Sequence, residues 1–254
     1  MRYSSELDFI IIGGTKCGTS TISKMLGEHR SINIEYNDVH VFSGNSTPSC
    51  SKELNAEIYG EKSARYLYSK DSLLRIKCET KNQIKLIVCL RDPVYRFISH
   101  YNHSLKMGLE SRSLLEVVQE GCHSNYYLRS AYYKFIVVLF EIFDKNQVHV
   151  CYFEDMITNT QNFFDEICDF LEADKIEVHL KHYNRTYIFR SSLIESIYAK
   201  LFGARYRDRL GKYIPTLFRD LNYNEDTINS IQELLQMESE KLKMDFGFNH
   251  SKWI

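Results

Sequence analysis

The sequence predicts an α/β fold of three layers, in which a central parallel sheet is flanked by helices on both sides. Short apolar runs at Phe9–Ile12, Lys85–Leu90 and Val148–Phe153 are typical of buried parallel strands. Segments of helical length separate them, so the connections must cross over the faces of the sheet. Ligands of such folds bind at the carboxyl ends of the strands. We therefore look for chemistry in the residues that directly follow each strand.

The first two strands end in recognisable turn and helix signals. The run Phe9–Ile12 leads into Gly13-Gly14, and Thr19–Glu28 is predicted to be the following helix. After Lys85–Leu90, Asp92 suits a helix N-cap and Pro93 the first helical position. Both strand ends are thus predicted to open directly into helices.

The remaining elements are mostly helical. Ser113 and Glu116 form the pattern of a capping box, and a helix is predicted over roughly Tyr126–Phe143. Three further apolar faces have helical spacing: Val94, Phe97, Ile98, Tyr101 and Leu105; Phe163, Phe164, Ile167, Cys168 and Leu171; Ile228, Ile231, Leu235 and Leu242.

Composition and charge limit the classes of function that are possible. The chain has 254 residues, 44% hydrophobic and 26% charged, with a net charge of −1, which excludes a generally basic nucleic-acid coat. No linker or repeat divides it, so residues 1–254 are predicted to form a single domain. The seven cysteines are odd in number and form no CxxC pair, which favours reduced thiols in the cytoplasm. Neither a signal peptide nor a membrane-spanning run is apparent.

The segment after the first strand has the pattern of a phosphate-binding loop. In Gly13–Ser20 (GGTKCGTS), glycines allow backbone N–H groups to surround an anion at a helix N-terminus. Against the Walker pattern GxxxxGK[ST], Thr19 stands where the lysine is expected and the lysine occurs earlier, as Lys16. The fold is therefore predicted to be P-loop-like. The alternative is a tight turn with an exposed lysine.

Several segments together resemble one family. IIIGGTKCGTSTISKML resembles the 5′-phosphosulfate loop of sulfotransferases that use 3′-phosphoadenosine-5′-phosphosulfate (PAPS), in the heparan sulfate branch with its soluble bacterial relatives. KLIVCLRDPVYRFISHY is similar to the 3′-phosphate motif RDPxxRxxSxY of that family. NDVHVF resembles its KExHFF segment and EKSARY its EKTPxY segment; the end of the chain resembles its closing helix and Trp. The resemblance covers most of the chain in order.

The resemblance implies a donor site. Lys16 would stabilise the leaving phosphate, and Arg91 would hold the 3′-phosphate, where a planar guanidinium can bind through two hydrogen bonds. Ser99 would add a hydroxyl to that phosphate, and Arg190 would cover the nucleotide. The residues expected to surround the donor in the loop are Thr15, Lys16, Cys17, Gly18, Thr19, Ser20 and Thr21.

The resemblance also implies an acceptor site. Asp38 occupies the position of the catalytic glutamate of the family, and the shorter side chain requires either a closer approach of the acceptor or a shift of the loop. His40 would orient this base or act as the base itself. Lys62 matches a second family lysine near the sulfuryl group. For Asp38 the alternative is a helix N-cap or a solvated loop acid, for Lys62 a solvated lysine, and for His40 a structural role.

The resemblance implies transfer of a sulfuryl group from PAPS to a hydroxyl, or less favourably an amine, of a glycan-type acceptor, without a metal; the acceptor class rests on the resemblance alone. A small hydroxylated metabolite or a lipid is the alternative acceptor. A P-loop kinase is disfavoured because position 19 lacks the Walker lysine. A non-catalytic nucleotide-binding protein is the third possibility. The sequence determines neither the acceptor nor the oligomeric state.

Overall fold

The protein is described here by a computed structural model that covers residues 6–38, 40–44, 56–180 and 223–254. By its internal contacts the chain divides into two compact units. Unit 1 comprises Met1–Asp92, Tyr132–Lys181 and Phe248–Trp253; unit 2 comprises Pro93–Ala131, His182–Gly247 and Ile254. The expectation of one domain over residues 1–254 stays a prediction.

Unit 1 is built on a five-stranded sheet in which every adjacent pair is parallel. The strand order is β2-β3-β1-β4-β5. The strands are β1 Phe9–Gly13, β2 Ile32–Asp38, β3 Ile58–Lys62, β4 Lys85–Leu90 and β5 Val148–Tyr152. From β1 the chain continues to β2 and β3 on one side, whereas from β4 it continues to β5 on the other. The carboxyl ends of β1 and β4 therefore form a topological switch point, where ligands of open α/β sheets bind.

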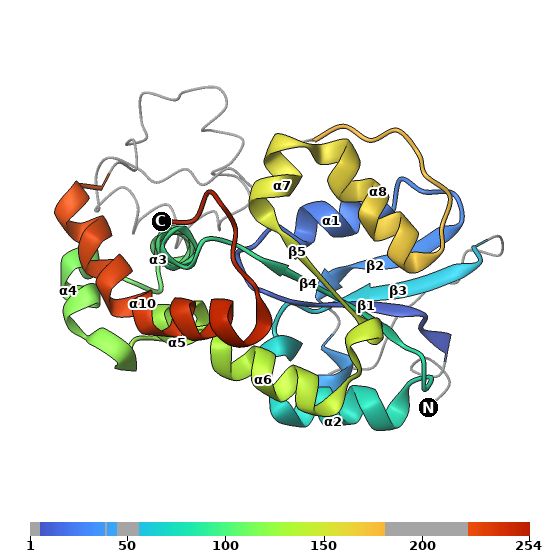
Figure 1. Cartoon of the computed structure of the whole chain (residues 1–254), viewed down its shortest axis with the longest axis horizontal. Helices are drawn as coiled ribbons and strands as arrows, with labels where there is room; N and C mark the ends of the chain where they lie inside the picture. Colours follow the sequence, from blue (N-terminus) through green and yellow to red (C-terminus); the bar gives the residue numbers. More distant parts are fainter. Residues whose placement is uncertain (1–5, 39, 45–55, 181–222) are drawn as a thin grey trace. The chain divides into compact units, whose positions relative to one another are not determined.

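Helices cover both faces of this sheet, as Figure 1 shows. The helices α1 (Thr19–Leu26), α7 (Phe153–Thr158) and α8 (Thr160–Leu171) lie on one face. The helices α2 (Lys70–Glu79) and α6 (Tyr133–Ile142) lie on the other and contact one another. The predicted three-layer α/β fold is thereby confirmed.

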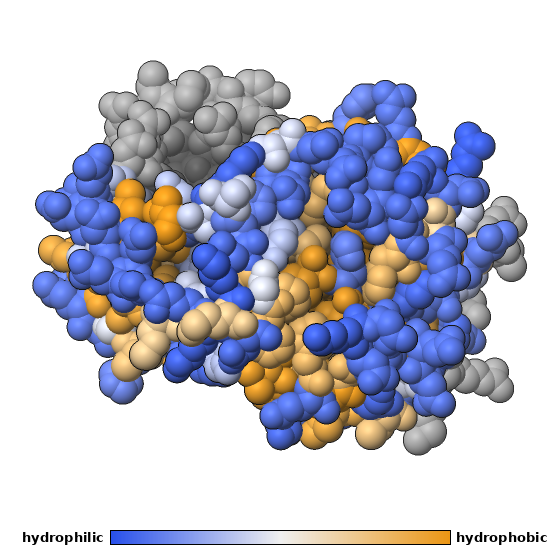
Figure 2. Space-filling model, in the orientation of Figure 1, coloured by the Kyte–Doolittle hydropathy of each residue, from blue (hydrophilic) through white to orange (hydrophobic). Residues whose placement is uncertain are grey.

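The core of unit 1 explains which strands were predictable. Residues Phe9–Gly13 and Leu86–Leu90 are buried throughout, as expected for central strands flanked on both faces. The strand β2 was not predicted from the sequence, because its buried Ile32 and Ile34 alternate with Asn33 and Glu35 at the edge of the sheet. The apolar side chains of α6 contribute to the hydrophobic area seen over that helix in Figure 2.

Unit 2 is helical and has its own core. It contains α3 (Pro93–Met107), α4 (Leu114–Gln119), α5 (Asn125–Ser130) and α10 (Glu225–Phe246). Its core includes Val94, Phe97, Ile98 and Tyr101 from α3 together with Ile231 and Leu235 of the predicted α10 stripe, and Ile228 packs against it. Pro93 begins α3, and Ser113 forms the predicted capping box of α4 with Glu116. These local predictions are confirmed.

The prediction of one helix over Tyr126–Phe143 is wrong, because the chain forms α5 and α6 with a break between Ser130 and Tyr133. The hydroxyl of Ser130 donates a hydrogen bond to the carbonyl of Tyr126, and the guanidinium of Arg96 donates to both of these oxygens. At Ala131 the backbone turns away from helical geometry. These contacts end α5, and the break coincides with the boundary between the two units.

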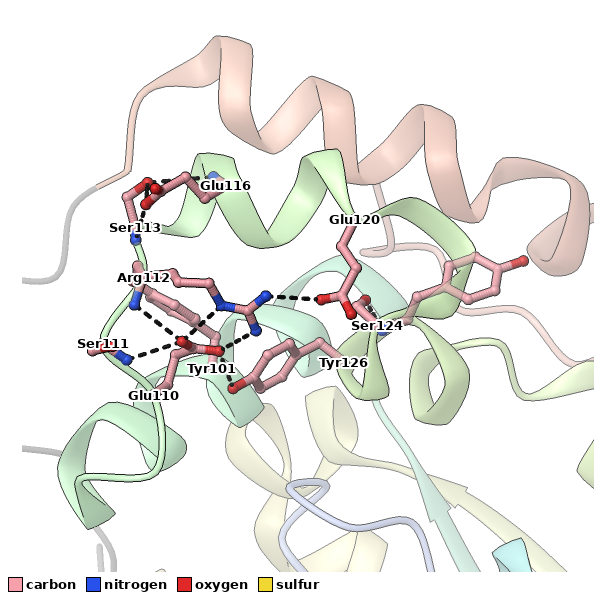
Figure 3. A network of polar contacts seen from close by, with 10 residues as sticks. Tyr101, Glu110, Ser111, Arg112, Ser113, Glu116, Glu120, Ser124 and Tyr126 are labelled. Carbon is pink, nitrogen blue, oxygen red and sulfur yellow. Dashed lines mark hydrogen bonds and ion pairs between the residues drawn. The ribbon is translucent and has the colours of Figure 1, made fainter.

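A polar network holds the connection between α3 and α4 (Figure 3). Glu110 accepts hydrogen bonds from the guanidinium of Arg112 at 2.8 Å and from the Tyr126 hydroxyl at 3.1 Å. The Tyr101 hydroxyl donates to the carbonyl of Arg112 at 2.8 Å. Chiefly because of its hydrogen bonds to Arg112, the pKa of Glu110 is lowered to about 2. This carboxylate is therefore charged throughout the physiological range.

Candidate functional site

The phosphate-loop pattern lies between β1 and α1, as expected. Two of its residues adopt left-handed backbone conformations, Lys16 with φ 67° and Gly18 with φ 89°. Because Gly18 occupies the N-cap of α1, no N-cap side chain makes a capping hydrogen bond to the first turn of the helix. The N–H groups at the start of a helix have no partner within it and carry a partial positive charge. The loop therefore presents donors suited to an anion.

Gly18 also fits closely against the neighbouring helix α7. A Cβ atom at this position would lie 2.6 Å from the Cε of Met156 and 2.9 Å from the Cδ2 of Phe153. Both the positive φ and this close approach require glycine here. The loop is thus packed directly on the first turn of α7.

Hydrogen bonds from other elements hold the loop from behind. The N–H of Gly14 donates to the carbonyl of Cys89 at the end of β4, at 2.8 Å. The N–H of Thr15 donates to the hydroxyl of Tyr68 at 3.1 Å, and the thiol of Cys17 lies 3.4 Å from the hydroxyl of Tyr132. These contacts come from three separate segments of the chain, so the loop conformation is fixed by the tertiary structure.

Arg91 follows β4 directly and reaches the loop. Its Nη1 donates to the carbonyl of Lys16 at 3.4 Å, and its guanidinium lies 4.4 Å from the centre of the Phe153 ring. The carbonyl of Arg91 accepts a hydrogen bond from Tyr132 at 3.0 Å. The ring contact orients the plane of the guanidinium and leaves further N–H groups of its fork for a ligand.

Lys62 ends β3 and connects the loop to Asp38. Its Nζ lies 3.5 Å from the Ser20 Oγ and 3.4 Å from the Asp38 Oδ1. The same carboxylate oxygen accepts the backbone N–H of Ala64 at 3.2 Å. The Lys62 side chain is only 6% exposed, whereas that of Asp38 is 42% exposed. A buried ammonium and an accessible carboxylate therefore lie next to the phosphate loop.

An irregularity in the sheet brings this pair together. The register of β2 and β3 runs from Ile32 opposite Ile58 to Glu35 opposite Glu61. An unbroken register would set residue 36 opposite Lys62, but the register shifts and Asp38 is the partner. Bulges re-aim side chains in this way near functional sites.

His40 lies just beyond β2, with φ 55°. Its Nδ1 lies 2.8 Å from the hydroxyl of the buried Ser63, which leaves Nε2 as the nitrogen outside this contact. Nearby, the hydroxyl of Tyr66 accepts the backbone N–H of Phe42 at 3.2 Å. Burial, followed by the charge of Glu61, raises the pKa of Tyr66 well above its ordinary value. The Tyr66 hydroxyl therefore stays protonated and supports the loop that carries His40.

The structure thus gathers most of the predicted residues in unit 1. The members found there, on the loop, the start of α1 and the ends of β2, β3 and β4, are Thr15, Lys16, Cys17, Gly18, Thr19, Ser20, Thr21, Asp38, His40, Lys62 and Arg91. Ser99 lies on α3 in unit 2. Arg190 lies outside the described residues.

The residues that support this site were not predicted from the sequence. Tyr68, Tyr132 and Phe153 contact the loop or Arg91 but stand outside the residues assigned a role. Ser63 contacts His40 from the segment EKSARY, directly after Lys62. Ser63 and Phe153 directly follow a strand, and this position is their sequence signal, whereas Tyr68 and Tyr132 have none. Arg96 matches the family motif as well, but it is fully buried and bonded within unit 2.

Comparison with known proteins identifies the family. Residues 6–191 match the sulfotransferase domain, and this match covers well over half of the chain. The chain belongs to the sulfotransferase family. The heparan sulfate branch inferred from the motifs is a finer assignment and stays a proposal. No curated protein matches the chain.

Solved structures share the fold of this sulfotransferase. A crystal structure of a sulfotransferase from Alicyclobacillus acidocaldarius has a TM-score of 0.71 and 18% identity, and the match covers 98% of this chain and 99% of that chain. The sulfotransferase domain from the Synechococcus PCC 7002 olefin synthase has a TM-score of 0.51 and 15% identity, covering 91% and 94%. At these identities the likeness concerns the fold.

Two further findings concern metals and membranes. Among the residues that the structure describes, no cluster of three or more His, Cys, Asp or Glu side chains is arranged to hold a metal ion. Within the same part of the chain, no helix combines the length and the hydrophobicity needed to cross a membrane.

Proposed function

We propose that this sulfotransferase transfers a sulfuryl group from PAPS to a hydroxyl group. The observation that carries the proposal is the meeting of the phosphate loop and Arg91 at adjacent strand ends, where Arg91 Nη1 lies 3.4 Å from the carbonyl of Lys16. A donor with phosphates at both the 5′ and the 3′ position requires two such anion sites within one nucleotide. A nucleoside diphosphate would not use the second site.

The donor set at the site fits this ligand. The first-turn N–H groups of α1, behind the uncapped Gly18, suit the 5′-phosphate, and Lys16 adds a charge at the tip of the loop. Arg91, oriented by Phe153, suits the 3′-phosphate. The resemblance assigns Ser99 to the 3′-phosphate and Arg190 to the cover of the nucleotide, and both roles remain proposals.

In the proposed reaction the acceptor oxygen forms a bond to sulfur while the bond between sulfur and the 5′-phosphate oxygen breaks. Lys16 and Lys62 stabilise the negative charge that develops on the leaving and peripheral oxygens. Asp38 accepts the proton of the acceptor hydroxyl, because its carboxylate is accessible and lies close to the loop. It is 3.4 Å from Lys62 Nζ, which in turn is 3.5 Å from the Ser20 Oγ. His40 orients the acceptor. The products are the sulfated acceptor and adenosine 3′,5′-bisphosphate.

The assignment of the base is tested by comparing Asp38→Asn with His40→Ala. We expect Asp38→Asn to lower kcat by about 100-fold or more, the usual contribution of a general base. We expect His40→Ala to raise KM for the acceptor more than it lowers kcat. If only the histidine substitution abolishes turnover, His40 is the base and Asp38 positions Lys62.

For the acceptor we propose a carbohydrate, on the resemblance of the motifs to the heparan sulfate branch. A small hydroxylated metabolite or a lipid is the alternative. Incubation with labelled PAPS and a panel of glycans, small alcohols and lipids distinguishes these classes, and labelling of lipids or metabolites alone would overturn the carbohydrate assignment. We further propose a cytoplasmic location, on the odd number of cysteines in the sequence.

The donor is tested by calorimetry with adenosine 3′,5′-bisphosphate and ADP. We expect the bisphosphate to bind at least about tenfold more tightly, a difference of about 1.4 kcal/mol, because only the bisphosphate engages Arg91. Equal affinities would overturn the proposed donor. The same result, together with magnesium-dependent phosphoryl transfer, would identify a kinase instead.

A further inference from the structure

The segment Tyr152–Met156 makes contacts in two directions. Phe153 and Met156 pack against Gly18, and Phe153 also lies under the guanidinium of Arg91. Tyr152, Glu154 and Asp155 contact the segment Phe248–Trp253, which belongs to the same compact unit. One short stretch of chain therefore joins the phosphate loop and Arg91 to residues about 100 positions further along the sequence.

We propose that Glu154 and Trp253 are positioning residues that set the geometry of Arg91 for the 3′-phosphate. This inference rests on the proposed function. Glu154 Oε1 accepts the backbone N–H of Asp92 at 3.0 Å, and its Oε2 accepts the indole N–H of Trp253 at 3.0 Å. The peptide group between Arg91 and Asp92 is thereby tied to a carboxylate that is itself held by the indole.

Because Glu154 is buried, its carboxylate depends on both of these hydrogen bonds. Glu154 is 8% exposed, so each carboxylate oxygen relies on the protein for its hydrogen bonds. A buried carboxylate that loses one donor is strongly penalised and shifts toward water or another donor. Loss of the indole N–H would therefore displace Glu154 and release the N–H of Asp92. Because Phe153 is the adjacent residue, the ring that orients Arg91 would move as well.

Contacts other than the indole hydrogen bond keep Phe248–Trp253 in place. His250 Nε2 lies 3.0 Å from Asp155 Oδ1. The ring of Tyr152 lies 5.4 Å from that of His250 and 5.5 Å from that of Trp253, while Phe248 contacts Phe140. Replacement of the indole by another aromatic ring should therefore remove one hydrogen bond without detaching the segment. This makes a point substitution informative.

The experiment measures the affinities of adenosine 3′,5′-bisphosphate and of AMP, which lacks the 3′-phosphate. For Trp253→Phe we expect the preference for the bisphosphate to fall about tenfold relative to wild type, with little change for AMP. Lys252→Ala is the matched control, because Lys252 is an exposed residue of the same segment. It should leave both affinities unchanged.

A second substitution tests the connection through the carboxylate. Glu154→Gln retains one oxygen for Asp92 but places an NH₂ group against the indole N–H, so we expect the same loss of preference. In the double variant Glu154→Gln/Trp253→Phe this clash of donors is removed. The preference should then be no lower than in Glu154→Gln alone, which is the non-additivity expected of directly coupled residues.

The outcomes separate the two proposals. If the wild type shows no preference for the bisphosphate, the proposed function fails. If the wild type shows it and both single variants retain it, Glu154 and Trp253 do not position Arg91. If the variants lose affinity for the bisphosphate and AMP by the same factor, their role is structural only, and the positioning proposal is overturned.

Discussion

Gly18→Ala should destabilise the protein by more than an ordinary glycine substitution. With φ 89°, any side chain at this position meets the cost of left-handed backbone, roughly 1 kcal/mol. The new Cβ would also lie 2.6 Å from Met156 Cε and 2.9 Å from Phe153 Cδ2. Overpacking of this kind costs about 1–3 kcal/mol. The sum is about 2–4 kcal/mol, which for a chain of this size lowers Tm by roughly 4–16 °C.

Gly121→Ala is the matched control for this substitution. Gly121 also has a positive φ, 64°, but a Cβ there would meet no atom within 4 Å. The control therefore carries the backbone cost alone, roughly 1 kcal/mol, and should lower Tm by about 2–4 °C. The difference between the two variants isolates the close approach of the loop to α7.

Thermal unfolding followed by circular dichroism, with urea titration for the free energies, measures this difference. Because Met156 supplies the shortest contact, Gly18→Ala should lower the free energy of unfolding less in a Met156→Ala background than in the wild type. Equal destabilisation by Gly18→Ala and Gly121→Ala would refute the packing argument. It would mean that the first turn of α7 can move away from the loop without cost.

Other predictions concern charges. Lys16→Ala should reduce transfer at least about 100-fold while circular dichroism shows an intact fold; retained activity would exclude its assigned role. Glu110→Gln should lose about 1–2 kcal/mol of unfolding free energy above pH 4.5, because the wild-type pKa is lowered to about 2. That difference from wild type should vanish in urea titrations as the pH falls from 4.5 to about 2. Arg96→Lys should cost about 2–3 kcal/mol in the same assay. Nη1 of Arg96 donates to Tyr126 and Ser130 while Nη2 lies 3.3 Å from Nδ1 of His100, and a single ammonium cannot replace both nitrogens.

The predictable part of this protein is the part dictated by hydrophobic runs and strand ends. Fully buried strands such as β1 and β4 are continuous apolar segments, and parallel connectivity forces their carboxyl ends to one edge. Lys16 and Arg91 could therefore be expected at one site from the sequence alone. The edge strand β2 and the break between α5 and α6 could not, because alternation at an edge and a buried Arg96 leave little trace in the local pattern.

The residues that support the site could not be predicted from the sequence, for a different reason. Tyr68 and Thr15 are 53 positions apart, and Trp253 and Glu154 are 99 positions apart, so their hydrogen bonds exist only after the layers have packed. The pairing of Asp38 with Lys62 likewise depends on a register shift that no count of residues predicts. The charged groups that we propose to bind the donor could be predicted from the topology, whereas the groups that orient them depend on packing. Substitutions of Phe153, Glu154 or Trp253 therefore measure how far packing, rather than charge alone, determines recognition of the donor.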